Sequence, residues 1–532
     1  MSLIKIENLS LSINNHEILN KINFKTSAGK ILGIIGESGS GKSMTANSIV
    51  QLLPKGSKIS GKIILENQNL LDLSEKQMCQ IRGGEIGFIF QEPMTALNPL
   101  KNIGDQVAES ISLHFNYGRK KSLQLASDTL ERVGLPQKLF SLSRFPFELS
   151  GGQRQRVVIA MAIATKPKLL IADEPSTALD VTTQAKLLKL LKKLVVEDNI
   201  GLLMITHDLA VIAEMADDII IMKNGQIVEF GQTSILAKGL KNPYSKSLFD
   251  ASNYRPKINM GQLSEKPLLV IKNLTKEYDI KQKGFFSQKE KFKAVKNVSF
   301  QIYEGENVGL VGESGCGKST LTRAILGLDH LDGGSIFLDG DVIIQGRVEK
   351  DSRKKIQVVF QDPYGSFNPR HQVKKIITEP LYLLKTKMNK VAIKDLVSEI
   401  LLSVGLKPED GEKFIHEFSG GQRQRIAIAR SLIIKPKLII LDEAVSALDV
   451  SVRSQILDLL AKLSKDYNLS YLFISHDLSL VKSITNRVFV MQAGEIVESG
   501  KTLDIFNMPQ HNYTKTLIQS TPNLNSAIKK LN

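Results

Sequence analysis

The chain has 532 residues, of which 23% are charged and 42% are hydrophobic, and its formal net charge is +16 at pH 7. This length exceeds the size at which a single hydrophobic core stops growing, so we expect more than one domain. No run of about 18 apolar residues occurs, and the N-terminal residues carry Lys5 and Glu7 within a strand-like pattern. A membrane-spanning helix and a signal peptide are therefore not expected, and a soluble, cytoplasmic protein is.

The positive charge does not by itself identify a partner. It is compatible with a nucleic acid or an anionic membrane surface, but the lysines are scattered, as in a lysine-rich proteome. The two cysteines, Cys79 and Cys316, lie in different halves without the spacing of metal ligands. A disulfide framework or a zinc site is therefore improbable.

The first informative motif is a glycine-rich loop that follows an apolar run, Ile31 to Ile35, and opens a helix-compatible stretch. In this context the pattern is that of a Walker A loop. Its backbone N–H groups and the helix N-terminus would attract the β- and γ-phosphates, Lys42 would add a full charge, and Ser43 would bind Mg²⁺. The loop consists of Gly36, Glu37, Ser38, Gly39, Ser40, Gly41, Lys42 and Ser43.

Further polar motifs follow in the first half. Ser150 precedes a helix-compatible run, Arg154 to Thr165, whose N-terminus would attract an anion, although a simple helix cap is the alternative. Asp173 ends an apolar run, Leu169 to Ala172, which places its carboxylate at the sheet edge where ligands usually bind. Exposed acids at a strand end are the alternative there. In chain order these motifs are Gln91, Ser150, Gly151, Gly152, Gln153, Asp173, Glu174 and His207.

Near residues 250–266 the periodicity is lost and turn formers gather. We therefore expect a first domain over residues 1–250, a short linker over 251–266, a second domain over 267–506 and a tail over 507–532. A basic, irregular stretch, Lys281 to Lys293, predicts an exposed loop within the second domain.

The second half repeats the motifs of the first in the same order. The apolar run Asn307 to Val311 leads into a second glycine-rich loop, so two nucleotide sites are expected. This doubling also makes a ligand-free glycine turn an improbable interpretation. Alternation of apolar runs with helical patterns such as Gln184 to Val196 predicts an α/β fold with a largely parallel sheet in each half. The repeated residues are Gly312, Glu313, Ser314, Gly315, Cys316, Gly317, Lys318, Ser319, Thr320, Gln361, Ser419, Gly420, Gly421, Gln422, Asp442, Glu443 and His476.

The order Walker A loop, glutamine, Ser-Gly-Gly-Gln, Asp-Glu and histidine resembles the nucleotide-binding domain of ABC ATPases, and the resemblance covers nearly the whole chain twice. It implies tandem P-loop domains, each with a RecA-like parallel-sheet core, an antiparallel β subdomain and a helical subdomain. It also implies ATP and Mg²⁺ as cofactors. In that family the domains stack head to tail, so one ATP would lie between residues 36–43 and 419–422, and the other between 312–319 and 150–153.

The resemblance further implies a role for each matching residue. Glu174 and Glu443 would be general bases, a role worth about 10²- to 10⁴-fold in rate. The histidines, each in a repeated His-Asp-Leu, would contact the γ-phosphate, and residues 177–180 and 446–449 resemble D-loops. Tyr278 occupies the place of an adenine-stacking aromatic, where the first half offers Ile13 or His16. These histidines are His207 and His476, and Gln91 and Gln361 would sense the γ-phosphate and the metal. The residues implied in metal binding are Ser43, Gln91, Asp173, Ser319, Gln361 and Asp442.

Cys316 lies beside Lys318 and close to a helix N-terminus. Both features lower the pKa of a thiol, so Cys316 is expected to be reactive if it is accessible, and its alkylation would block the second site. Cys79 is expected to matter little. Because no cysteine follows Cys316, an iron–sulfur cluster is not expected.

Three features resemble the dipeptide, oligopeptide and nickel importer branch of the ABC family. They are the glutamine-loop phrases at residues 90–99 and 360–369, the segments at 242–248 and 511–517, and Phe145-Pro146-Phe147-Glu148 before the first Ser-Gly-Gly-Gln motif. The resemblance implies a subunit that powers import of peptides or peptide-like solutes, as in microcin C or oligopeptide uptake systems. It would bind peripherally at the cytoplasmic face of the inner membrane to two integral membrane permeases. An extracytoplasmic solute-binding protein would act indirectly, and no specific nucleic-acid partner is expected.

The main alternative is a ribosome-associated ATPase of the ABC-F type, which is also tandem, basic and of similar length. Such proteins join their domains with a long charged helical hairpin, whereas the expected linker is short and contains Pro256 and Gly261. A DNA-repair ATPase would need a long coiled-coil insertion, and the sequence has none.

Overall fold

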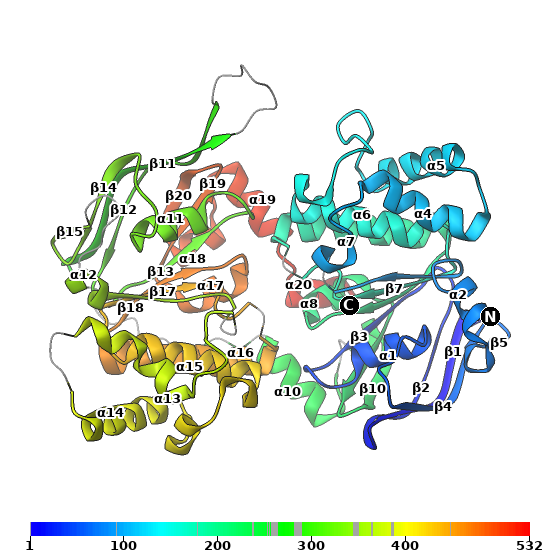
Figure 1. The fold of residues 1–532 in the computed structure, drawn as a ribbon, viewed down its shortest axis with the longest axis horizontal. Helices are drawn as coiled ribbons and strands as arrows, with labels where there is room; N and C mark the ends of the chain where they lie inside the picture. Colours follow the sequence, from blue (N-terminus) through cyan, green and yellow to red (C-terminus); the bar gives the residue numbers. More distant parts are fainter. Residues whose placement is uncertain are drawn as a thin grey trace. The chain divides into compact units, whose positions relative to one another are not determined.

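The computed structural model describes residues 2–91, 93–177, 179–236, 239–252, 254, 256, 264–280, 290–343, 350–362, 365–384, 388–446 and 448–531. Two compact units divide the chain (Figure 1). The first contains residues 1–179, 183–253 and 522–532, and the second contains residues 180–182 and 254–521. Most of the expected linker at 251–266 and residues 281–289 of the expected basic loop lie outside the described residues.

A six-stranded sheet forms the core of the first unit. Its strand order is β10-β9-β3-β8-β7-β6, and only β10 runs antiparallel to its neighbour. The central strands are buried along their whole length, as expected for a parallel sheet that is covered on both faces. The strands span β3 Ile31–Ile35, β6 Ile86–Ile89, β7 Leu169–Asp173, β8 Gly201–Ile205, β9 Asp218–Lys223 and β10 Gln226–Gln232.

A second sheet of the first unit is antiparallel and four-stranded, in the order β2-β1-β4-β5. Ile4 and Ile6 alternate along the first strand, as do Leu9 and Leu11 after a register shift, and all four are buried in the hydrophobic core of the unit. One face of this sheet therefore covers the core. The strands are β1 Ile4–Ile13, β2 His16–Thr26, β4 Ser57–Leu65 and β5 Gln68–Asn69.

The helices of the first unit fall into two groups. One group, α4, α5 and α6, packs together as a helical subdomain (Figure 1). The others flank the sheets. They are α1 Lys42–Ile49, α2 Glu75–Ile81, α3 Pro93–Ala96, α4 Ile103–Phe115, α5 Arg119–Arg132, α6 Gly151–Ile163, α7 Val181–Asp198, α8 Leu209–Met215, α9 Thr233–Leu236 and α10 Pro243–Ser252.

The second unit repeats this architecture. Its mixed sheet has the order β16-β17-β18-β13-β19-β20, and its antiparallel sheet has the order β12-β11-β14-β15. The strands are β11 Pro267–Ile280, β12 Glu290–Tyr303, β13 Asn307–Val311, β14 Gly333–Leu338, β15 Asp341–Ile343, β16 Ile356–Val359, β17 Leu438–Asp442, β18 Ser470–Ile474, β19 Arg487–Gln492 and β20 Glu495–Lys501.

Helices of the second unit occupy the corresponding positions, and α13, α14 and α15 pack together (Figure 1). The expected α/β fold, with an antiparallel β subdomain and a helical subdomain in each half, is confirmed. The helices are α11 Lys318–Ile325, α12 Lys350–Lys355, α13 Val373–Thr378, α14 Lys390–Ser403, α15 Gly420–Leu432, α16 Val450–Tyr467, α17 Leu478–Ile484, α18 Thr502–Asn507 and α19 Asn512–Ser520. None of the helices in the described ranges is both long and apolar enough to span a bilayer.

The last helix, α20 (Leu524–Leu531), belongs to the first unit. It packs against α8 and α9 and buries Leu524 and Ala527 (Figure 1). Asn523 caps its first turn, because the Oδ1 atom of Asn523 accepts a hydrogen bond from the backbone N–H of Ser526 at 3.0 Å. Residues 507–521 stay with the second unit, so the expected tail contributes to both units.

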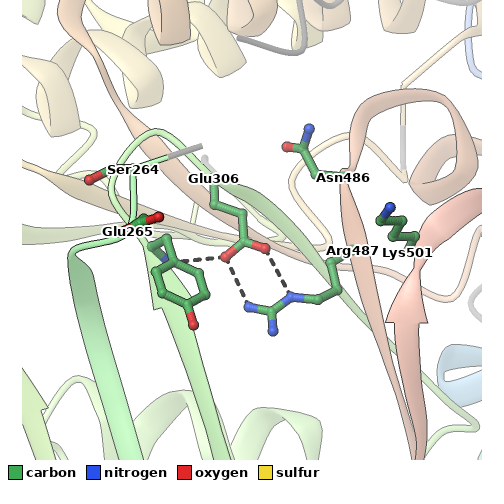
Figure 2. A pocket seen from close by; sticks show the side chains of 7 residues that line it. Ser264, Glu265, Glu306, Asn486, Arg487 and Lys501 are labelled. Atoms are coloured by element: carbon green, nitrogen blue, oxygen red, sulfur yellow. Dashed lines mark hydrogen bonds and ion pairs between the residues drawn. The ribbon is translucent and has the colours of Figure 1, made fainter. Parts of the chain in front are cut away.

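A cavity of about 390 Å³ lies at the amino ends of β13 and β19 in the second unit (Figure 2). Its floor is an ion pair in which Glu306 accepts hydrogen bonds from Arg487 Nε and Nη2, each at 2.9 Å. The Glu306 side chain is only 2% exposed, and it also accepts a bond from the backbone N–H of Tyr303 at 3.0 Å. Glu306 and Arg487 therefore satisfy each other at the amino end of the parallel strands, opposite to the end that carries the glycine-rich loop.

Replacing Arg487 by leucine is expected to destabilise the second unit by about 3 kcal/mol, because Glu306 would become an unpaired buried charge. In the first unit, Lys30 pairs with Asp217 at 2.8 Å, with side-chain exposures of 55% and 37%. Lys30→Met therefore serves as the matched control and should cost less than about 1 kcal/mol. Denaturant unfolding of both variants measures the difference, and equal losses would contradict the assignment of Glu306 as a buried charge.

Candidate nucleotide site

The two glycine-rich loops join a buried central strand to a helix in the same way. In the first unit, Lys42 Nζ donates hydrogen bonds to the carbonyl oxygens of Gly36 at 2.9 Å and Glu37 at 2.8 Å. Lys318 Nζ makes the same bonds to Gly312 and Glu313 at 2.8 and 2.9 Å. Each loop thus curls around the ammonium group that the sequence analysis assigned to phosphate binding.

Two buried polar atoms at the first loop have no hydrogen-bond partner among the residues that the structure describes. They are the hydroxyl oxygen of Ser40 and the Oδ1 atom of Asp173, which ends β7. Ser43 lies close enough to lower the pKa of Asp173, against the larger effect of burial. Buried polar atoms are normally paired, and a phosphate with its counter-cation would satisfy both.

Glu174 and Glu443 adopt an unusual backbone conformation. Their φ angles are 49° and 50°, in the left-handed region that residues other than glycine seldom occupy. The backbone N–H of Glu174 donates a hydrogen bond to the carbonyl oxygen of Ile205, and that of Glu443 donates to the carbonyl oxygen of Ile474. Each acceptor lies on the neighbouring strand, at 2.9 Å. Backbone strain of this kind concentrates at functional sites, where it aims a side chain in a defined direction.

Each of these glutamates pairs with the histidine that was predicted to contact the γ-phosphate. His207 Nδ1 lies 3.3 Å from Glu174 Oε1, and His476 Nδ1 lies 3.3 Å from Glu443 Oε1. The glutamate and the histidine of each pair are far apart in the sequence. The fold brings them together with the same geometry in both units.

Neighbouring carboxyl groups have pKa values shifted in opposite directions. Burial, reinforced by the adjacent glutamate, raises the pKa of Asp173 and raises the pKa of Asp442 to about 6. Burial also acts to raise the pKa values of Glu174 and Glu443, but the histidine hydrogen bonds and the lysine charges outweigh it and lower them. The glutamates are thus kept ionised, and a cation beside either aspartate would favour its ionised form.

The two units differ around the glutamate. Gln91 Nε2 donates to Glu174 Oε2 at 3.0 Å, and Thr177 Oγ1 donates to the same oxygen at 3.0 Å. In the second unit the hydroxyl of Ser446 bonds the backbone carbonyl of Glu443 instead, at 2.8 Å. Glu92, Pro363 and Tyr364 of the glutamine-loop phrases lie outside the described residues.

The Ser-Gly-Gly-Gln motifs form helix N-termini. The hydroxyl of Ser150 accepts from the N–H of Gln153 at 3.3 Å, and Gln153 Oε1 accepts from the N–H of Ser150 at 2.9 Å. Ser419 and Gln422 form the same capping box at 3.4 and 3.0 Å. The helix-cap interpretation is therefore confirmed, and it leaves the phosphate role of the motif as a prediction.

The two glycines of each motif differ in their surroundings. A Cβ atom on Gly152 would overlap Thr183, and one on Gly421 would overlap Val452, so packing requires glycine there. A Cβ atom on Gly151 or Gly420 would meet nothing within 4 Å. Packing does not require these first glycines, and their open surroundings would let a ligand approach the backbone closely.

Comparison with known proteins identifies the family. The family model described as "ABC transporter" matches residues 19–177 and 295–446. The family model described as "Oligopeptide/dipeptide transporter, C-terminal region" matches residues 497–532. The chain belongs to the ABC transporter family. It is an ABC-type ATP hydrolase with duplicated ATP-binding domains, on the oligopeptide-importer branch.

Two similar relatives are named as import ATP-binding proteins. The chain is 40% identical to the glutathione import ATP-binding protein GsiA of Escherichia coli strain K12, over 98% of this chain and 90% of that protein. It is 41% identical to GsiA of Salmonella choleraesuis strain SC-B67, over 95% of this chain and 86% of that protein. A solved ATP-binding cassette, MJ0796 bound to ADP and Pi, is 28% identical and covers 44% of this chain and 99% of its own, with a TM-score of 0.39. The transporter-type match at residues 497–532 and the importer relatives exclude the ABC-F alternative.

The position that was predicted to stack on adenine differs between the two units of this ABC protein. Tyr278 on β11 is 41% exposed, and its hydroxyl donates to Asp329 Oδ2 at 3.2 Å, so the ring is held on the surface. In the first unit, Ile13 and His16 face each other at the end of the β1–β2 hairpin. Adenine stacking by Tyr278 stays a prediction.

The expectation of a reactive Cys316 is wrong for the folded ABC domain. The thiol is only 6% exposed, and burial raises its pKa although Lys318 acts in the opposite direction. Cys79 is exposed. The sequence revealed the nearby charge but not the long-range packing that covers the thiol.

Alkylation of the native protein is therefore expected to label Cys79 and spare Cys316, because only an accessible thiolate reacts. Limited treatment with iodoacetamide followed by peptide mass spectrometry measures both sites, and ATPase activity should be retained. Cys79→Ser is the control and should remove nearly all labelling. Rapid labelling of Cys316 in that variant, with loss of activity, would contradict the buried position of this thiol.

Proposed function

We propose that the protein is the ATP-hydrolysing subunit of an importer for peptides or peptide-like solutes. The observation that carries this proposal is the glutamate–histidine contact that recurs in both units, on a chain whose residues 497–532 match the oligopeptide/dipeptide transporter C-terminal region. The names of the relatives, which specify glutathione import, support a peptide-like solute. The subunit would act at the cytoplasmic face of the plasma membrane, with two permeases and, indirectly, an extracytoplasmic solute-binding protein.

In each site the glycine-rich loop would bind the phosphates of ATP. Lys42 or Lys318 would turn from the loop carbonyls toward the phosphates, and Ser43 with Asp173, or Ser319 with Asp442, would hold Mg²⁺, assisted by Gln91 or Gln361. The unpartnered oxygen of Asp173 and the raised pKa of Asp442 fit a cation ligand. The bound Mg²⁺ would supply charge stabilisation at the phosphates.

The glutamates would supply the base. Glu174 or Glu443 would accept a proton from the attacking water, since the low pKa keeps each carboxylate ionised. His207 or His476 would orient that carboxylate through the 3.3 Å contact. We further propose that the Ser-Gly-Gly-Gln motif of each domain contacts the nucleotide held by the glycine-rich loop of the other, with its open first glycine nearest the phosphate.

The helical subdomains would receive the permeases. Leu97 and Phe367, which open these subdomains, are buried, so neither can contact a partner. Leu100 is 86% exposed, and Arg370 is exposed at the corresponding position of the second unit. An exposed leucine beside helices of this kind suits an apolar docking contact.

Photochemical cross-linking tests the proposal. Leu100→Cys and Arg370→Cys, in a Cys79→Ser background and labelled with a thiol-reactive benzophenone, should cross-link to multi-span membrane proteins in the native membrane on illumination. Lys62→Cys is the control, because this exposed residue lies on the antiparallel sheet. The same cells should take up a labelled dipeptide or glutathione in an ATP-dependent manner. Cross-links to soluble proteins alone, with uptake unchanged when the chain is deleted, would refute the importer function.

A further inference from the structure

A tyrosine from the C-terminal segment of each ABC domain reaches the glycine-rich loop. In the first unit, the backbone N–H of Glu37 donates a hydrogen bond to the hydroxyl oxygen of Tyr244 at 3.2 Å. In the second unit, the N–H of Glu313 donates to the hydroxyl oxygen of Tyr513 at 2.8 Å. The partners are 207 and 200 residues apart in the sequence.

These bonds act on the same peptide group that the loop lysine holds. The N–H of Glu37 and the carbonyl of Gly36 belong to one planar peptide unit. Lys42 bonds the carbonyl at 2.9 Å while Tyr244 accepts from the N–H. In the second unit, Lys318 and Tyr513 hold the peptide between Gly312 and Glu313 in the same way.

This peptide requires external support because its first residue is in a conformation that only glycine adopts readily. Gly36 and Gly312 both have φ of +155°. A glycine has no side chain to restrict the rotation of its peptide, so hydrogen bonds to the peptide restrict it instead. When the lysine turns toward a phosphate, the hydrogen bond to the tyrosine still holds this peptide.

The tyrosines are themselves held by a repeated anchor. Glu229 on β10 accepts bonds from the N–H groups of residues 241 and 242, and Asn242 Oδ1 accepts from the N–H of Tyr244 at 2.9 Å. In the second unit, Glu498 on β20 accepts from residues 510 and 511 at 2.7 and 3.1 Å. There the ring atom Nδ1 of His511 accepts from the N–H of Tyr513 at 3.2 Å.

The same geometry is thus built from different residues. The first segment reads Asn242-Pro243-Tyr244 and the second reads His511-Asn512-Tyr513, so the cap residue differs while the carboxylate and the tyrosine are kept. Tyr513 is 8% exposed, and burial raises its pKa, so its hydroxyl stays neutral. The contact between the tyrosine and the loop recurs in both units although the residues that support it differ. Incidental packing would not be expected to produce this repeat.

We propose that Tyr244 and Tyr513 are positioning residues for ATP binding, which hold the first peptide of each glycine-rich loop in the orientation that receives the phosphates. The C-terminal segment of each domain is thereby coupled to nucleotide affinity. This inference rests on the proposed assignment of the glycine-rich loops as the phosphate sites.

The test replaces each tyrosine by phenylalanine, which removes only the hydroxyl oxygen. Tyr513→Phe, Tyr244→Phe and the double variant should raise the KM for ATP, about three- to tenfold in the double variant, and leave kcat within about twofold. If the loop adopts its binding-competent conformation for a smaller fraction of the time, the apparent affinity for ATP falls in proportion to that fraction. Titration of a fluorescent ATP analogue without turnover should show the same loss of affinity.

Tyr471→Phe is the matched control. Its hydroxyl is fully buried in the same unit and donates to the carbonyl of Leu460 at 3.1 Å, away from the loop. It should lower the melting temperature at least as much as Tyr513→Phe and leave KM unchanged. If Tyr513→Phe fails to fold, Tyr244→Phe, at a less buried position, decides the question.

The outcomes separate this inference from the proposed function. If Lys42→Ala and Lys318→Ala abolish ATP binding but the phenylalanine variants keep the wild-type KM, the tyrosines are merely structural and the inference is overturned. If the lysine variants bind ATP normally, the assignment of the loops themselves is wrong.

Discussion

Replacing Glu174 and Glu443 together by glutamine is expected to slow ATP turnover by at least about 100-fold, because each site loses the carboxylate that we propose as its general base. ATP binding should be retained. Glutamine keeps the size of the side chain, and an amide oxygen can still accept the bonds that Gln91 and Thr177 make to Glu174. Phosphate release and nucleotide retention by the purified variant measure both effects.

The single variants and a distant control complete this experiment. Glu174→Gln and Glu443→Gln should each slow turnover, because both glutamates share the strained backbone and the histidine contact. Glu85→Gln removes an exposed carboxylate that pairs with Lys168 and should leave turnover unchanged. Wild-type turnover by Glu443→Gln would show that the second site is not a major catalytic site.

Replacing Gly312 by alanine is expected to weaken nucleotide binding at the second site by about 100-fold. The added Cβ atom would overlap the carbonyl oxygen of Met491 and lie 2.8 Å from Cys316 Sγ. The loop would have to move, and Lys318 would lose its carbonyl partner on Gly312. A strain of about 3 kcal/mol corresponds to a factor of about 100 in affinity. Binding of a fluorescent ATP analogue should fall from two sites to one.

Gly340→Ala is the matched control for this prediction. Gly340 also has a positive φ, +85°, but a Cβ atom there would meet nothing within 4 Å. The substitution should cost about 1 to 2 kcal/mol of stability and leave both nucleotide sites intact. Loss of binding in Gly340→Ala as well would mean that general destabilisation, and not the geometry of the loop, explains the first result.

The sequence predicted the local parts of this fold and site well. The runs Ile31–Ile35 and Asn307–Val311 are strands with the expected bounds, because short apolar runs before a glycine-rich loop leave few alternatives. The residues Asp173, Glu174 and His207 lie at strand ends, as predicted. The motifs of the second half could be assigned from those of the first because both halves carry them in the same order.

Features that depend on distant contacts could not be predicted. The left-handed backbone of Glu174 follows from a hydrogen bond to Ile205 on the neighbouring strand, and no local pattern encodes it. Burial of Cys316 by the core reversed the pKa shift expected from Lys318. The bond from Glu313 to Tyr513 joins segments 200 residues apart. The only sign of this bond in the sequence was the tyrosine that recurs in the two C-terminal segments.

The position of α20 affects how the protein is made. Residues 522–532 belong to the first unit, although the ribosome adds them after all of the second unit. At about 5 to 20 residues per second, synthesis of residues 254–521 takes on the order of 10 to 60 seconds. During this interval the surface of α8 that α20 covers is exposed on the nascent chain. The first unit therefore begins folding early but is completed last, and chaperones that bind apolar surfaces have this interval in which to protect it.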